Sequence, residues 1–235
     1  MLNRRELFMG TAGIMAAQTG FHISPGLAAE PTYEEVAAEV RAPLRGDDRR
    51  ELVRYASLAA NSHNTQPWKF RIADDAIEII PDLSRRCPAV DPDDHHLFVS
   101  LGCAAENLVL AAATMGLRAE PAFAGDRIRI VLTPGPPQRS ALADAIPQRQ
   151  STRAPYDGKP VPADQIRLLE DAGRGQGVSV VMIADRGRMD NVLDYVVQGN
   201  TAQMRDKAFV EELKSWIRFN DGQALATRDG LSQSA

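Results

Sequence analysis

The chain has 235 residues and a net charge of −4, with 27 Lys and Arg residues against 31 Asp and Glu residues. Hydrophobic residues make up 44% and charged residues 25%, which is ordinary for a soluble globular protein of one large domain or two small ones. The acidic balance gives no electrostatic signature of binding to nucleic acid or to an anionic membrane, and we expect no nucleic-acid partner.

The first 29 residues have the pattern of an export signal. Arg4 and Arg5 precede a modestly apolar run over residues 7–21, and small residues at 26–29 offer a cleavage site. We interpret residues 1–29 as a twin-arginine signal peptide, which predicts the twin-arginine export machinery as a partner and a periplasmic or other extracytoplasmic location. The alternative is a short amphipathic helix that contains two arginines by chance.

The folded pattern begins after a polar stretch, residues 30–45, that is predicted to be a linker. Residues 48–60 predict a helix, because acidic residues open it and small or apolar residues recur on one face. Residues 68–73 and 77–81 predict the two strands of a hairpin joined by a short acidic turn. The first part of the fold therefore starts with a helix followed by an antiparallel strand pair.

Two adjacent histidines, His95 and His96, follow a segment rich in aspartate and proline. Neighbouring side chains on a helix point about 100° apart, so such a pair rarely chelates one ion. We therefore expect no metal here and predict that the aspartates cap the helix that follows. These aspartates are Asp91, Asp93 and Asp94.

Residues 97–116 are apolar on nearly every face of a helix. A membrane span is the alternative interpretation, but Glu106 and Asn107 lie at its centre, where an ionised carboxylate would be costly in a bilayer. A helix that is apolar all round is typical of a buried position between layers. We predict the central core helix here and no stable membrane span.

The two cysteines, Cys87 and Cys103, would meet an oxidising compartment after export. The sequence does not decide whether they form a disulfide, because it does not fix the distance between their Cα atoms. Cys103 lies among small residues of the predicted core helix and is expected to be a buried apolar residue.

The later part of the chain predicts one more strand and several helices. Residues 127–133 alternate as a strand with Ile128, Ile130 and Leu132 facing inward, and a helix is expected over 140–146. Residues 188–219 are predicted to be helical, with two apolar stripes packed into a core. The stripes consist of Met189, Val192, Leu193, Val196 and Val197, and of Phe209, Leu213, Trp216 and Ile217.

The segment between the first helix and the hairpin is unusually polar. It contains Asn61, Ser62, His63, Asn64, Thr65 and Gln66 in succession, followed by Pro67 and Trp68. Asn and Ser favour local bonds between side chain and backbone, and Pro67 favours an extended Gln66. Such a loop can present polar groups to a flat heteroaromatic ligand, and an ordinary turn after a helix is the alternative.

This segment resembles the flavin-contacting motif of the nitroreductase family, on the pattern S-x-N-x-Q-P-W-x-F from Ser62 to Phe70. The string NSHNTQPWKFRI is most similar to the branch whose chains contain two nitroreductase-like halves. A second motif, Arg149-x-Ser151-x-Arg153, resembles the FMN-phosphate motif of the same family, and APYDGKPVP after it resembles the family's continuation. The stretches WIRF at 216–219 and TRDGL at 227–231 also resemble this branch.

The order of the two motifs suggests a fused pseudo-dimer. Ordinary nitroreductases carry R-x-S-x-R before the flavin loop, whereas here it follows the loop. Residues 51–75 and 165–186 both have the pattern of a helix, a break, a strand and Ile-Ala-Asp, although the identity between them is low. We expect a first half over residues 46–137 and a second half over 138–235, the second incomplete at its end.

The fold implied by the resemblance is a nitroreductase-like α+β fold with an antiparallel-type sheet and a long buried helix. The implied cofactor is FMN, whose phosphate would be held by Arg149, Ser151 and Arg153. The side chains expected to line the isoalloxazine ring are Asn61, Ser62, His63, Asn64 and Gln66. No catalytic residue is named, because the flavin carries the hydride chemistry.

The implied activity is two-electron reduction of a small-molecule acceptor, such as a nitroaromatic or quinone-like compound, with NAD(P)H as the donor. Nicotinamide nucleotides belong to the cytoplasm, which conflicts with the expected export. An exported protein that binds or sequesters flavin without turnover is therefore an alternative, as is a remnant that binds nothing.

Overall fold

The computed structural model of the protein describes residues 31–151, 154–175 and 177–232. Its described part divides into two compact units, with unit 1 running up to Gln150 and resuming at Glu212, and unit 2 spanning Ser151–Glu211. The predicted signal peptide, residues 1–29, lies outside the described residues. Each unit is considered by itself.

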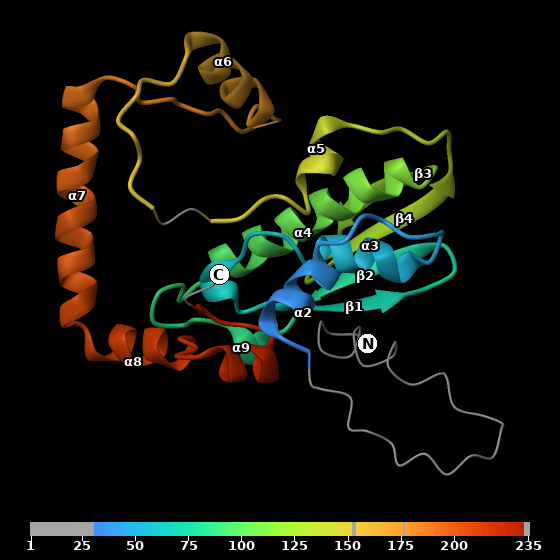
Figure 1. Cartoon of the computed structure of the whole chain (residues 1–235), viewed down its shortest axis with the longest axis horizontal. Coiled ribbons are helices and arrows are strands. Elements are labelled where there is room, and N and C mark those ends of the chain that lie inside the picture. The colour runs from blue at the N-terminus through green and yellow to red at the C-terminus, as the bar shows by residue number, and fades with distance from the viewer. Residues whose placement is uncertain (1–30, 152–153, 176, 233–235) are drawn as a thin grey trace. The chain divides into compact units, whose positions relative to one another are not determined.

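Unit 1 is built on an antiparallel sheet with strand order β1-β2-β4-β3 among the described residues (Figure 1). Its elements are α2 (Tyr33–Val40), α3 (Arg49–Ala56), η1 (Ser62–Asn64), β1 (Trp68–Ile72), β2 (Ala76–Pro81), η2 (Leu83–Arg85), α4 (His95–Thr114), β3 (Leu117–Phe123), β4 (Ile128–Pro134), α5 (Ala141–Ala145) and α9 (Asp221–Thr227). The α+β class, the antiparallel sheet and the long core helix are as expected from the sequence.

The hairpin forms because alternate residues of its strands are apolar. β1 and β2 pair antiparallel, with Phe70 opposite Ile79, and β2 pairs with β4, with Ile77 opposite Ile130. These four side chains are buried in one core, so the face of the sheet that they share is the face that packs. The predicted strand over 127–133 is confirmed, with Ile130 and Leu132 buried and Ile128 partly so.

Helix α4 contributes the other side of this core. Leu101, Ala104 and Leu108 are fully buried, and α4 contacts α3 and strands β2, β3 and β4. By length and composition alone α4 is apolar enough to cross a membrane. Its burial against the sheet identifies it instead as the core helix of unit 1, as the sequence predicts.

The start of α4 confirms the prediction of an acidic cap. The carboxylate of Asp91 accepts hydrogen bonds from the backbone N–H groups of His96, at 3.0 Å, and Leu97, at 3.0 Å. These groups lack partners inside the helix, so Asp91 satisfies two donors of the first turn that the helix itself leaves unpaired. The ring of His96 also lies against Asp91, with Nδ1 3.1 Å from Oδ1.

Two elements of unit 1 differ from the sequence-based expectation. The predicted linker contains helix α2, which is closed at its start by a capping box between Thr32 and Glu35. Strand β3 pairs along its whole length with β4 and forms one edge of the sheet, yet no strand is predicted there.

The cysteines also differ in part from expectation. Both are free thiols; Cys87 is buried, and Cys103 is only partly buried although it packs against the core. Burial raises the pKa of the Cys87 thiol to about 11, with the negative charges of Glu212 and Asp91 adding to the shift. Cys87 is therefore an unreactive thiol.

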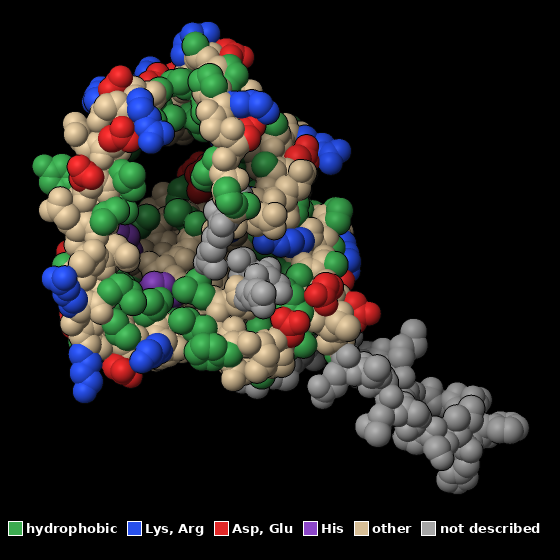
Figure 2. Space-filling view, turned by 60° about the vertical axis from the view of Figure 1, so that its left-hand side comes forward, with side chains coloured by type: hydrophobic (Ala, Val, Ile, Leu, Met, Phe, Trp, Pro, Cys, Tyr) green, Lys and Arg blue, Asp and Glu red, His purple; other side chains and the backbone are tan. Residues whose placement is uncertain are grey.

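Unit 2 contains α6 (Ala163–Ala172) and α7 (Arg186–Arg205), and α8 (Lys207–Ser215) crosses its boundary with unit 1. The predicted helices are present, but the expected core around the first stripe is not. Within the described residues of α6 and α7, none is buried. All five residues of that stripe are exposed, from Met189 at 45% to Val196 at 59%. Figure 2 shows such hydrophobic side chains, coloured green, at the surface.

The strand expected in the second half is also wrong. Gly177 lies in a turn and residues 179–185 have no regular secondary structure, so the only pairing near this position among the described residues is an isolated bridge between Gly175 and Val178. The likeness of residues 165–186 to residues 51–75 therefore extends to the helix and not to the strand that follows it. Periodicity shows which face of a segment is apolar but not what covers that face.

Candidate functional site

The polar loop, residues 61–66, lies between α3 and β1 and has a strained backbone. His63, Asn64 and Gln66 have φ angles of 48°, 51° and 54°, in the left-handed region that side chains other than glycine rarely adopt. The extended Gln66 expected before Pro67 is therefore wrong. Each such residue costs of order 1–3 kcal/mol and persists only where its surroundings hold it. Three of them within four positions are typical of a loop whose shape is maintained for a purpose.

Hydrogen bonds inside the loop account for part of this shape. Asn61 Oδ1 accepts from the backbone N–H of Gln66 at 2.8 Å, and Asn64 Oδ1 accepts from Gln66 Nε2 at 2.7 Å. Asn61 also donates from Nδ2 to the carbonyl of Ala59. Several of the amides expected to line a flavin thus also maintain the loop, which the sequence pattern alone does not reveal.

The loop has an accessible part and a buried part. Residues 61–64 are partly exposed, whereas Thr65, Gln66, Pro67 and Trp68 are buried. A ligand can therefore approach Asn61, Ser62, His63 and Asn64 directly. Gln66, whose exposure is 6%, donates a hydrogen bond to the side chain of Asn64. The hydrophobic end of the motif, Trp68 and Phe70, anchors the loop in the core.

His63 is the titratable group of the accessible part. Burial lowers the pKa of His63, and the negative charge of Glu212 opposes this shift only in part. Glu212 is itself fixed, because its carboxylate accepts hydrogen bonds from the backbone N–H groups of Ala89 and Val90. At neutral pH His63 is thus a neutral imidazole, which can donate one hydrogen bond and accept another.

Arg149 lies at the base of the loop. Its Nη2 donates to the carbonyl of Leu58 at 2.9 Å, three residues before Asn61. Arg41, from the segment after α2, donates to the carbonyls of Pro147 and Arg149 at 2.8 Å and 2.9 Å and so fixes the backbone that carries Arg149. The sequence analysis singled out Arg149 but missed Arg41.

The structure therefore places one of the three predicted phosphate ligands, Arg149, against Leu58, three positions before the segment that carries the five predicted ring-lining residues. Ser151 is exposed and belongs to unit 2, and Arg153 lies outside the described residues. Residues at 228–232 contact the loop as well, although the sequence analysis assigned them no role in the site. They follow α9 and are some 166 positions from Asn64, so no local pattern marks the contact.

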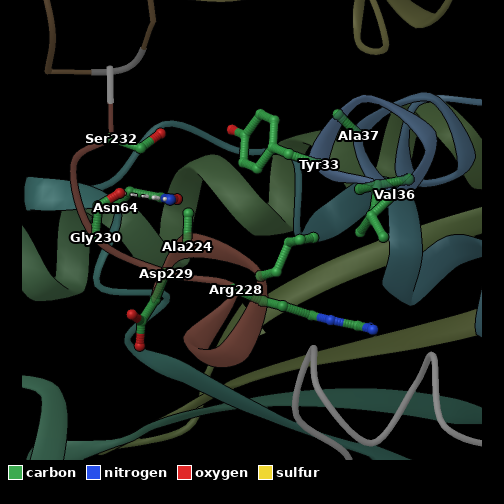
Figure 3. Close-up of a pocket in the computed structure, with 11 residues that line it drawn as sticks. Tyr33, Val36, Ala37, Asn64, Ala224, Arg228, Asp229, Gly230 and Ser232 are labelled. Atoms are coloured by element: carbon green, nitrogen blue, oxygen red, sulfur yellow. Dashed lines mark hydrogen bonds between the residues drawn. The ribbon is translucent and has the colours of Figure 1, made fainter. Parts of the chain in front are cut away.

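A small cavity lies beside the loop, between α2 and the segment after α9 (Figure 3). It is lined by Tyr33, Val36, Ala37 and Val40 from α2, by Asn64, and by Ala224, Leu225, Arg228, Asp229, Gly230 and Ser232. Its volume is about 60 Å³, well below the roughly 300–1,000 Å³ of pockets that enclose cofactor-sized ligands. This cavity is not a flavin pocket.

The two histidines at the start of α4 do not form a recognisable metal centre with other described residues. The rings of His95 and His96 are nearly perpendicular, with centroids 5.4 Å apart. Among the described residues, no group of three or more His, Cys, Asp or Glu side chains is arranged to hold an ion. Asp91, which the sequence placed in the acidic cluster, serves as the cap of α4.

The described part of the chain thus combines an α+β fold with an amide-rich loop close to Arg149, and two known proteins are similar to the chain. Two proteins of Mycobacterium tuberculosis, from strains CDC 1551 / Oshkosh and H37Rv, are each 30% identical to the chain over 177 residues. Both are named "Putative NAD(P)H nitroreductase". The alignment covers 71% of this chain and 50% of each relative, so the chain spans about half the length of the curated relatives it matches.

No protein-family model matches the chain. The similarity to the two mycobacterial proteins nevertheless supports the nitroreductase family, the family that the loop motif resembles. The aligned 177 residues exceed the length of either motif, so the relationship does not rest on one short string.

Proposed function

We propose that the protein is an FMN-dependent oxidoreductase that reduces nitroaromatic or quinone-like acceptors by two electrons. The observation that carries this proposal is the position of Arg149 at the base of the strained polar loop, within one compact unit. The names of the two relatives support the reaction class and a nicotinamide nucleotide as electron donor.

The residues present fit FMN by their chemistry. The accessible Asn61, Ser62, His63 and Asn64 offer both donors and acceptors, as the pyrimidine edge of a flavin requires. Arg149 is exposed and is held near the start of the loop by its bond to the carbonyl of Leu58, and a guanidinium at such a position can pair with a phosphate. Ser151 and Arg153 are the further phosphate ligands proposed from the motif.

Each of these residues has a role that does not depend on acid–base catalysis. FMN, when bound, would supply the hydride transfer. The loop would orient the ring through amide and hydroxyl hydrogen bonds, and neutral His63 would donate to or accept from the ring edge or the acceptor. Arg41 would hold Arg149 in place through its bond to the Arg149 carbonyl.

The organisation and location of the protein are part of the proposal. The order of the two motifs, together with an alignment that covers only half of each relative, supports a two-half, pseudo-dimeric arrangement. The paired Arg4 and Arg5 support export by the twin-arginine route, which carries proteins that have already folded around a cofactor. Replacing both arginines by lysine should leave the protein in the cytoplasm, as cell fractionation would detect.

Absorbance of the purified full-length protein tests the function. An FMN enzyme shows flavin bands that bleach with NADH or NADPH and recover on addition of a nitroaromatic. Bleaching only by dithionite, with no turnover of a nitroaromatic or quinone, would favour the flavin-holding alternative. Absence of flavin bands together with no binding of added FMN would refute the proposal.

A further inference from the structure

The segment that follows α9 forms a two-way bond with the polar loop. The backbone N–H of Gly230 donates to the carbonyl of Asn64 at 2.9 Å, and Asn64 Nδ2 donates to the carbonyl of Gly230 at 3.0 Å (Figure 3). We name residues 228–232 the latch segment. Both bonds involve Asn64, one of the three residues with a positive φ, so the latch segment acts directly on the loop.

Asp229 anchors the latch segment between two arginines. Its Oδ1 accepts from Arg218 at 2.5 Å and 3.1 Å, and its Oδ2 accepts from Arg85 Nη1 at 2.7 Å. The side chain of Asp229 is only 7% exposed, so these bonds are largely removed from water. Buried pairs of this kind fix geometry strongly, because removing one partner leaves a buried charge unpaired.

Arg85 connects this anchor directly to the loop. The same Nη1 that bonds Asp229 donates to the carbonyl of Thr65 at 2.7 Å. Thr65 is almost fully buried and stands between two of the strained residues, Asn64 and Gln66. Two consecutive carbonyls of the loop therefore accept hydrogen bonds from outside it: that of Asn64 from Gly230 and that of Thr65 from Arg85.

The latch segment is itself held from the other side. The backbone N–H of Leu231 donates to the carbonyl of Trp216, and that of Arg218 donates to the carbonyl of Leu231, each at 2.8 Å. Gly230 has a φ of +80°, and a Cβ at this position would lie 2.5 Å from the Trp216 carbonyl oxygen. Only glycine fits here, so the segment approaches both neighbours more closely than any other residue would allow.

We propose that Asp229 is a positioning residue that holds the polar loop in its ligand-binding conformation through Arg85 and Gly230. The identity of the ligand, FMN, rests on the proposed function; the ordering of the loop does not. A loop with three left-handed residues relaxes unless its surroundings over-determine it, and a preordered loop binds its ligand without the entropic cost of ordering.

The test compares Asp229→Asn with the unmodified full-length protein by hydrogen exchange and FMN titration. The variant keeps the size of the side chain but loses its charge, so the arginine bonds weaken. Amides of residues 62–66 should exchange at least about tenfold faster relative to those of the β1–β2 hairpin. The Kd for FMN should rise about tenfold or more, and Tm should fall, because the partly buried arginines lose their charged partner.

Two further variants guard against loss of folding. Arg85→Lys keeps a positive charge at a partly exposed position, but its ammonium lacks the reach and the planar shape of the guanidinium that bonds both Thr65 and Asp229, so it should also release the loop. Arg86→Lys is the matched control, because Arg86 is adjacent and similarly exposed but pairs with Asp94. The control should leave both loop exchange and FMN affinity unchanged.

The outcomes separate this inference from the proposed function. Faster exchange of the loop amides in Asp229→Asn and Arg85→Lys, without any FMN binding by the unmodified protein, would support the positioning role of Asp229 and would refute the flavin proposal. Unchanged exchange of the loop amides in both variants would overturn the proposal that Asp229 holds the loop. Faster exchange spread evenly over loop and sheet would also overturn it, since it would indicate a purely structural role for Asp229.

Discussion

Replacing Arg149 tests the most specific part of the proposed site. In Arg149→Ala we expect FMN binding to weaken by about 2–3 kcal/mol, the scale of a lost hydrogen bond between charged groups. This corresponds to an increase in Kd of about 30- to 150-fold. Stability should fall by only about 1 kcal/mol or less, because Arg149 is exposed and makes one bond, to the carbonyl of Leu58, with its side chain.

The assay is titration of the full-length apoprotein with FMN, followed by quenching of flavin fluorescence, with Tm measured in parallel. Arg149→Gln separates charge from position, since its amide can still donate to Leu58 but cannot pair with a phosphate. Arg139→Ala is the control, because Arg139 is an exposed arginine of the same unit that pairs with Asp144. Riboflavin, which lacks the phosphate, should bind the unmodified protein and Arg149→Ala equally well. An unchanged Kd for FMN in Arg149→Ala would refute the phosphate assignment.

Three other predictions follow from single side chains. At pH 8, iodoacetamide should label Cys103 much faster than Cys87, whose thiol has a pKa of about 11; equal labelling by mass spectrometry would contradict the burial of Cys87. Asp91→Ala should destabilise the protein by about 1–2 kcal/mol in urea unfolding, because two backbone donors of α4 lose their acceptor, and an unchanged midpoint would exclude this cap. Burial alone would raise the pKa of Asp229, but the bonds from Arg218 and Arg85 lower this pKa overall. The ionised carboxylate therefore stabilises the folded protein at any pH above the ordinary carboxyl pKa, and this stabilisation is lost as the pH falls through the lower pKa of the folded state. Unfolding between pH 5 and pH 2, compared with Asp229→Asn, should show a shallower loss in the variant.

Much of unit 1 could be predicted from the sequence because its signals are local. The β1–β2 hairpin alternates apolar and polar residues, and α4 is apolar over five turns, so each segment specifies both its type and its burial. Helix α2 was missed although its capping box, Thr32 and Glu35, is readable in the sequence. Only Val40 of this helix is buried, so its sequence needs few apolar residues and its composition resembles that of a linker.

Strand β3 was missed for a different reason. It carries Arg118, Glu120 and Pro121, and proline in a strand is tolerated mainly at an edge, which is where β3 lies. Such a strand has little apolar alternation of its own and forms because β4 offers it a complete row of partners. The pairing, rather than the local sequence, determines this element.

The candidate site divides in the same way. The loop and Arg149 could be recognised from their motifs. The hydrogen bonds that Asn61 and Asn64 accept from Gln66 inside the loop could not, because the sequence does not show which donor an amide oxygen binds. The latch depends on contacts such as that between Arg85 and Asp229, 144 residues apart. No window of sequence contains both partners, and their charges alone suit many other pairings.

A crystal structure of the full-length protein with FMN tests the central claim most directly. The account predicts that the isoalloxazine ring lies against Asn61, Ser62, His63 and Asn64, with the phosphate bonded to the guanidinium of Arg149. A flavin bound away from both the polar loop and Arg149 would contradict it.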